Sequence, residues 1–230
     1  NDEFFIKIES SFKKKGSLTY GELLIPGRGK QEVLISTYVC HPQMANNELS
    51  GPLVSIALAK YFKNRINEKS LRFIFIPETI GSITYLHKNI NSIKKNVIGG
   101  YVLSCIGDER SYSYLPTKYG NTIADRAAKK AFKELSIKYK TFSFLDRGSD
   151  ERQFNSPGVD WPIASILRTK YNEYPEYHTS LDDFNLVTRK GLGGGFNVVK
   201  KAIEIFMQEI IPKSKTICEP TFWSIRKVDK

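Results

Sequence analysis

The chain has 230 residues, of which 40% are hydrophobic and 26% charged, and its 35 Lys and Arg against 24 Asp and Glu give a formal net charge of +11. This composition excludes a disordered tail, a collagen-like fibre and a small disulfide-stapled module. A chain of this size can bury roughly 70% of its unfolded surface around a single core, so we expect one domain. We place that domain at 1–212, with 213–230 as a C-terminal tail, and 1–15 can be the end of a preceding segment.

Strand and helix patterns alternate along the chain. Residues 4–9 and 18–25 alternate apolar and polar side chains and predict a hairpin, and the β-branched, aromatic run 32–40 predicts a buried strand. Helical spacing begins at 50–64. Farther along we predict strands at 71–76, 101–106 and 162–167, helices at 80–89, 122–135 and 195–209, and a short turn-helix at 150–154. The alternation predicts an α/β fold in which a mostly parallel mixed sheet lies between helices.

Charge, apolar runs and cysteines limit the location and the partners of the protein. Apolar runs are broken within about eight residues, far short of the ~20 that a membrane span needs, so we expect no membrane contact. The three cysteines, Cys40, Cys105 and Cys218, are widely spaced and predict reduced, buried thiols and a cytoplasmic protein. The lysines are scattered in twos and threes, a distribution that argues against a dedicated nucleic-acid site.

Potential metal ligands follow three predicted strands at the point where each strand ends. His41 follows 32–40, Glu78 follows 71–76 and Asp108 follows 101–106, and His178 comes later in the run YHTSLDD. In open α/β sheets, ligands collect at the carboxyl ends of the strands. Each residue alone is explained as well by a hydrogen-bonded histidine or a helix-capping acid. Together, two imidazoles and two carboxylates are donors that zinc accepts at about 2.0 to 2.2 Å, and they predict a zinc site.

Five segments resemble a known family. They are STYVCHPQMANNELSGP, FIPETIGSITYL, SCIGD, GSDERQF and EYHTSLDD, and they occur in the order expected for the aminopeptidase-like domain of bacterial proteins labelled as polysaccharide-biosynthesis proteins or uncharacterised peptidases. That domain is a relative of the co-catalytic zinc aminopeptidases and glutamate carboxypeptidases. The resemblance covers roughly 16–219 and implies the zinc-aminopeptidase (phosphorylase/hydrolase-like) fold with one or two zinc ions.

The resemblance also implies roles for single residues. His41 matches the first zinc-ligand histidine, and Asp108 matches the aspartate that shares its metal. His178 matches the histidine of the second metal, and Glu78 matches its carboxylate partner or the catalytic base. Asp150 lies in a motif on the substrate side and is a candidate substrate-binding residue.

The sequence departs from the family pattern at the position of the aspartate that bridges two zinc ions. Asn47 stands at this position, with Glu48 beside it. A neutral amide cannot neutralise two adjacent dications. Either Glu48 replaces the bridge as a metal ligand, or only one metal binds.

The second departure concerns the catalytic base. Relatives carry consecutive glutamates, one for the metal and one for the proton of the attacking water, whereas this chain has Pro77 before a single Glu78. If Glu78 is a ligand, Glu151 and Glu48 are the candidate bases, and a base must come within about 3 Å of the water. Arg152 or Tyr177 could stabilise the oxyanion.

These observations predict a zinc-dependent, aminopeptidase-like hydrolase that acts on a peptide or a small aminoacyl amide. The alternative is a catalytically impaired domain that keeps the fold and serves as a binding or scaffolding module in envelope polysaccharide biosynthesis. Hydrolysis of aminoacyl amides, with and without zinc, separates the two hypotheses.

Overall fold

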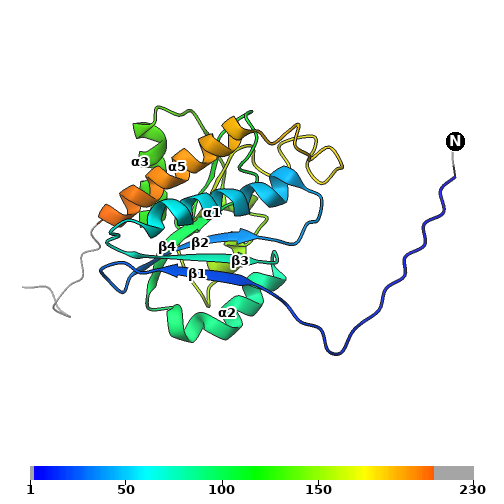
Figure 1. The fold of residues 1–230 in the computed structure, drawn as a ribbon, viewed down its shortest axis with the longest axis horizontal. Helices are drawn as coiled ribbons and strands as arrows, with labels where there is room; N and C mark the ends of the chain where they lie inside the picture. The colour runs from blue at the N-terminus through cyan, green and yellow to red at the C-terminus, as the bar shows by residue number, and fades with distance from the viewer. Residues whose placement is uncertain (1–2, 210–230) are drawn as a thin grey trace, which may run out of the picture.

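The computed structural model describes residues 3–209, in which seven strands form one mixed sheet (Figure 1). The strands are β1 (Gly21–Ile25), β2 (Glu32–Tyr38), β3 (Ser70–Ile76), β4 (Val97–Val102), β5 (Ser113–Leu115), β6 (Lys140–Thr141) and β7 (Ile163–Leu167). Their order across the sheet is β1-β3-β2-β4-β7-β5-β6. The central strands β3, β2, β4 and β7 run parallel, whereas β1 pairs antiparallel with β3 and β5 pairs antiparallel with β7. The carboxyl ends of the parallel strands therefore lie along one edge of the sheet.

Helices cover both faces of this sheet. They are α1 (Ser50–Lys63), α2 (Ile80–Ile93), α3 (Ile123–Glu134), α4 (Glu151–Phe154) and α5 (Arg189–Gln208), with a π-helical turn η1 (Ala45–Leu49) and a 3-10 turn η2 (Phe144–Asp146). One apolar core joins the sheet to α1, α3 and α5, and a second joins it to α2 and to Phe154 of α4 (Figure 1). Every residue of β2 is buried, as expected of a strand covered on both faces. The predicted α/β fold is confirmed.

Two glycines allow helices to approach the ends of the strands closely. A Cβ atom on Gly51, in the first turn of α1, would lie 2.4 Å from the carbonyl oxygen of Leu103. A Cβ atom on Gly191, in the first turn of α5, would lie 1.9 Å from the carbonyl oxygen of Gly107. Real Cβ atoms do not come so close, so both positions need glycine. The start of α1 therefore lies against the edge where the parallel strands end.

Some predicted boundaries were wrong. The strand predicted at 101–106 is β4, which ends at Val102, and Cys105 beyond it has a φ of 44° that no strand accommodates. The last helix, predicted at 195–209, begins earlier: α5 starts after Thr188, whose side chain caps the helix by accepting a hydrogen bond from the Gly191 amide. The predicted tail at 213–230 lies outside the described residues.

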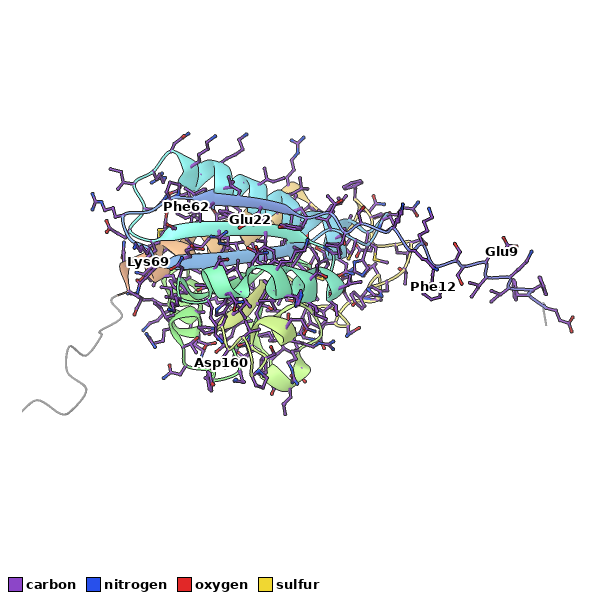
Figure 2. All side chains as sticks on the ribbon, turned by 90° about the horizontal axis from the view of Figure 1, so that it is seen from below. Glu9, Phe12, Glu22, Phe62, Lys69 and Asp160 are labelled. Atoms are coloured by element: carbon purple, nitrogen blue, oxygen red, sulfur yellow. The ribbon has the colours of Figure 1, made fainter. Side chains whose placement is uncertain are left out.

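The predicted N-terminal hairpin was also wrong. Residues 3–20 form neither helix nor strand and extend away from the sheet, as Glu9 and Phe12 show in Figure 2. Only 21–25 forms a strand, because its partner is β3 and not the segment before it. Among the helices that the structure describes, none has both the length and the apolar character needed to cross a membrane.

Candidate metal centre

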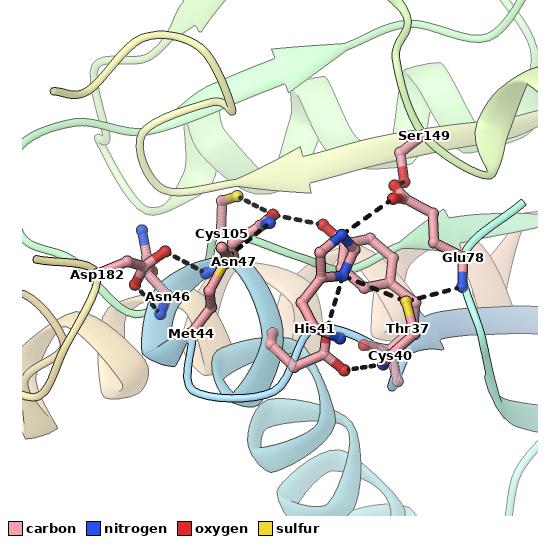
Figure 3. Close-up of polar contacts among 12 residues, drawn as sticks. Thr37, Cys40, His41, Met44, Asn46, Asn47, Glu78, Cys105, Ser149 and Asp182 are labelled. Carbon is pink, nitrogen blue, oxygen red and sulfur yellow. Dashed lines mark hydrogen bonds and ion pairs between the residues drawn. The ribbon is translucent and has the colours of Figure 1, made fainter. Parts of the chain in front are cut away.

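His41 and Glu78 lie at the edge where the parallel strands end. His41 follows β2 and Glu78 follows β3, and the two strands are neighbours in register, with Tyr38 opposite Ile76. The register places the two loops side by side (Figure 3). His41 Nε2 lies 3.7 Å from Glu78 Oε2. The two side chains are 23% and 24% exposed, so solvent can reach the pair although most of each side chain is buried.

Glu48 fixes the orientation of the His41 ring. Its Oε2 lies 3.0 Å from His41 Nδ1 and also accepts the backbone N–H of His41 at 2.9 Å, while its Oε1 accepts the backbone N–H of Cys40. Burial raises the pKa of Glu48, and the hydrogen bonds from His41 and Cys40 oppose that rise. With Nδ1–H donated to Glu48, the tautomer assigned from this network leaves the lone pair of Nε2 free on the side of Glu78.

The second histidine reaches the same place from the loop after β7. The His178 ring lies 5.5 Å from the His41 ring, centroid to centroid, at an angle of 45°. His178 has a φ of 57°, in the left-handed region, and its ring stacks on that of Tyr177 at 4.0 Å. Such backbone strain is concentrated at functional sites. The loop thus holds the His178 ring near that of His41 with its backbone in the left-handed region.

Two of the donors, His41 Nε2 and Glu78 Oε2, are spaced as ligands of one zinc ion. Two ligands about 2.1 Å from a tetrahedral ion lie about 3.4 Å apart, close to the 3.7 Å between His41 Nε2 and Glu78 Oε2. Two histidines and one glutamate are a donor set of catalytic zinc sites, which leave a fourth position to water. The hydrogen bond from His41 Nδ1 to the Glu48 carboxylate is the outer-shell contact that metal-binding histidines commonly make.

Two of the predicted metal ligands have other partners. Asp108 is 1% exposed, and its carboxylate accepts hydrogen bonds from the Thr169 amide and hydroxyl, the Arg110 amide and the Asn46 side chain. These donors hold Asp108 in a buried network and not in the group around His41. Glu48 contacts Nδ1 of His41, on the opposite side of the ring from Nε2 and Glu78.

Asn47 is also buried. Its Oδ1 accepts the Tyr38 hydroxyl at 2.7 Å and the Cys105 thiol at 3.4 Å, and its backbone N–H donates to Asp182. The amide oxygen that stands at the bridging position of relatives is thus committed to protein donors.

The segment 148–152 lies beside Glu78 but is not arranged as predicted. Glu151 is 0% exposed and accepts hydrogen bonds from the amides of Gly148 and Ser149 and from the hydroxyls of Tyr171 and Ser165, so it has no oxygen directed to solvent as a base requires. Asp150 is 0% exposed, and burial raises its pKa to about 7. Arg152 is exposed, and within residues 3–209 its guanidinium makes no polar contact with the histidines or with Glu78.

Two residues beside the histidine differ from what the sequence indicates: Ser149 contacts Glu78, and Cys40 is not buried. The Ser149 hydroxyl donates to Glu78 Oε1 at 2.5 Å, a contact that depends on how two distant loops meet (Figure 3).

Cys40, predicted to be buried, is exposed, and its sulfur lies 3.2 Å from His41 Nδ1 and accepts the Glu78 amide. In the described part of the chain, Cys40, His41 and Glu48 form a group whose ligand atoms lie within 4.8 Å of one another. Burial raises the pKa of Cys40 to about 11, so the thiol is protonated at neutral pH.

Known proteins share this fold. A candidate polysaccharide biosynthesis protein with an aminopeptidase-like domain, from Clostridium acetobutylicum, is 38% identical over 203 residues, which are 88% of this chain and 46% of that protein. The crystal structure of a candidate peptidase from the same organism has a TM-score of 0.80 at 35% identity, over 89% of this chain and 48% of the other. BSAP, a zinc aminopeptidase from Bacillus subtilis, has a TM-score of 0.69 at 17% identity, over 79% of this chain and 48% of its own.

These comparisons show the fold of the zinc aminopeptidases, and this chain spans about half the length of the relatives it matches. A family model described as "Domain of unknown function (DUF4910)" matches residues 9–209. The match includes His41, Glu78 and His178 together with every strand and helix of the fold. This chain therefore belongs to the DUF4910 family.

Proposed function

We propose that this protein is a zinc-dependent, aminopeptidase-like hydrolase of peptide or small aminoacyl-amide bonds, and that it binds one zinc ion. The observation that carries the proposal is the 3.7 Å between His41 Nε2 and Glu78 Oε2 at the carboxyl edge of the parallel strands, with the His178 ring 5.5 Å from the His41 ring. The zinc aminopeptidase named among the structural neighbours supports the choice of metal. His41, Glu78 and His178 would hold the ion, and zinc supplies Lewis acidity and a more acidic bound water.

Glu78 is the one of the three carboxylates considered that we propose as a zinc ligand, and we assign the proton of the attacking water to none of the three. Glu48 and Glu151, the other carboxylates considered, have their oxygens committed to protein donors. Glu78 gives one oxygen, Oε1, to Ser149 and directs the other towards His41.

Tyr177 is the proposed donor to the developing oxyanion. Its ring is half-buried and stacks on His178, which places it beside the reaction centre. Burial raises the pKa of Tyr177 to about 12, so the hydroxyl keeps its proton at neutral pH and can donate it in a hydrogen bond. We do not assign this role to the exposed Arg152.

A second function is a binding domain without turnover, and Asn47 is the observation that favours it. A buried amide at the bridging position, bonded to Tyr38 and Cys105, removes the charge that would hold a second zinc ion. The Clostridium relative is named for polysaccharide biosynthesis, which agrees with a scaffolding role in that process. Zinc binding without hydrolysis of any aminoacyl amide would support this second function.

The three histidines of the chain allow a matched test. We expect the wild-type protein to bind about one equivalent of zinc and to hydrolyse aminoacyl chromogenic amides. His41→Ala and His178→Ala should each lose most of both properties, because each removes one of three ligands. His87→Ala is the control, since His87 is exposed on α2 outside the site. Zinc content by elemental analysis that is unchanged in the His41 and His178 variants would contradict the proposal.

A further inference from the structure

Two adjacent residues hold the turn that carries Glu78. Ser149 contacts the Glu78 side chain, and Asp150 contacts the backbone of the next residue, Thr79. We propose that Ser149 and Asp150 are positioning residues that set the direction of the Glu78 carboxylate before any ligand binds. The inference rests on the proposed function, in which Glu78 faces the zinc ion.

Ser149 determines which carboxylate oxygen of Glu78 remains available. Its hydroxyl donates to Oε1 at 2.5 Å, and Oε2 is left 3.7 Å from His41 Nε2 (Figure 3). Ser149 is 2% exposed, so water cannot easily replace this donor. Without the bond, the Glu78 side chain, which is partly exposed, could rotate away from His41.

Asp150 holds the backbone next to Glu78 in a strained conformation. Its Oδ1 accepts the Thr79 amide at 2.7 Å and the Ser82 hydroxyl at 2.8 Å, at the first turn of α2. Thr79 has a φ of 60°, which a β-branched residue rarely adopts and which persists only when its surroundings enforce it. Asp150 is completely buried, and its Oδ2 has no hydrogen-bond partner among the described residues. A buried carboxylate kept at such a cost has a specific task, and holding Thr79 is the one that its contacts indicate.

The segment that contains Ser149 and Asp150 is itself fixed. Glu151 Oε1 accepts the amides of Gly148 and Ser149 and the hydroxyl of Tyr171, at 2.9, 3.0 and 2.9 Å. Tyr171 also accepts the Gly148 amide at 2.7 Å. A chain of buried hydrogen bonds thus runs from Tyr171 through Glu151 to Ser149 and ends on Glu78. These hydrogen bonds give the buried Glu151, predicted to be a base, an anchoring role.

The test uses Ser149→Ala, Asp150→Ala and Asp150→Asn, with Ser156→Ala as the matched control. Ser156 lies in the same loop region, and among residues 3–209 its hydroxyl bonds only the Gln153 carbonyl. Zinc affinity is measured by competition with a chromophoric chelator. Exchange of the Thr79 amide hydrogen is measured in the metal-free protein.

We expect Ser149→Ala to weaken zinc binding by about 10-fold or more, as outer-shell substitutions do, without changing exchange at Thr79. Asp150→Ala should weaken zinc binding and also speed exchange of the Thr79 amide by at least about 10-fold, because it removes the acceptor. Asp150→Asn should restore both properties, since its amide oxygen can accept the same two hydrogen bonds. Ser156→Ala should resemble the wild type.

Zinc affinity of Ser149→Ala within twofold of the wild type would overturn the role of Ser149. Exchange at Thr79 that is the same in Asp150→Ala and the wild type would overturn the role of Asp150. If the wild type binds no zinc, the proposed function fails, while the exchange measurement still decides whether Asp150 holds the turn. If Asp150→Ala does not fold, the other two variants decide. Slow exchange at Thr79 in Asp150→Asn together with weak zinc binding by Ser149→Ala supports the proposal. Fast exchange at Thr79 in Asp150→Asn together with wild-type zinc binding by Ser149→Ala overturns it.

Discussion

The single residue on which the site depends most is Glu48, because it fixes the His41 ring without facing the ion. In Glu48→Gln the charge is lost, and the side-chain amide can donate to His41 Nδ1. That contact would move the ring proton to Nε2, the atom that must bind the metal. We expect zinc affinity to fall by about 10- to 100-fold. Glu68→Gln is the control, since the Glu68 side chain forms an exposed ion pair with Arg28 away from the site. An affinity equal to that of the control would show that Glu48 does not orient His41.

The same scale explains which ligands could be predicted from sequence. His41 and Glu78 follow strands that are parallel neighbours, and the strand-end rule placed them together. Asp108 seemed to follow the same rule, but β4 ends at Val102 and the chain turns at Cys105 before Asp108 is reached. Thr169 and Asn46, both distant in sequence, then bind its carboxylate. Contacts between loops of this kind leave no local pattern in the sequence.

At the scale of elements, a buried carboxylate couples α3 to the sheet. Asp125, in the first turn of α3, accepts hydrogen bonds from Thr117, from Thr122 and from the hydroxyl of Tyr114 on β5. Burial by itself raises the pKa of Asp125, but the hydrogen bonds from Thr117, Tyr114 and Thr122 outweigh it and hold the pKa below its ordinary value. The capping box at the start of α3 therefore lies in the core of the protein.

A depressed pKa gives this carboxylate a defined dependence on pH. The stabilisation is present above the pKa of the unfolded chain, about 3.9, and is lost as the pH falls below that value. We expect Asp125→Asn to lower the free energy of unfolding by about 2 to 4 kcal/mol at pH 7 and by progressively less below pH 4, measured by urea unfolding. Asp160→Asn, at an exposed aspartate paired with Lys118, should change stability little at any pH. A loss for Asp125→Asn that does not vary with pH would contradict this explanation.

At the scale of the whole molecule, the architecture was predictable and the loops were not. Alternating strand and helix patterns were enough to predict a parallel sheet between helices, because the strands buried on both faces carry long apolar runs. The short strands β5 and β6 were missed, since their three and two residues carry too little pattern to recognise. The contacts of 148–151 could not be predicted for a related reason. Its partners, Glu78, Thr79 and Tyr171, lie far away in sequence.

The separation of the site from the cores predicts how the whole molecule responds to metal removal. The two large apolar clusters join the sheet to its helices, and His41, Glu78 and His178 belong to neither. A chelator should therefore leave the far-UV circular dichroism unchanged. Because zinc binds only the folded chain, a concentration 100 times the dissociation constant adds about 2.7 kcal/mol of stability, which raises Tm by about 5 to 10 °C for a chain of this size. His41→Ala should show no such rise, and His87→Ala should show all of it. Loss of helical signal on chelation would instead mean that the metal supports the fold, and a zinc-induced rise in the His41 variant would place the ion elsewhere.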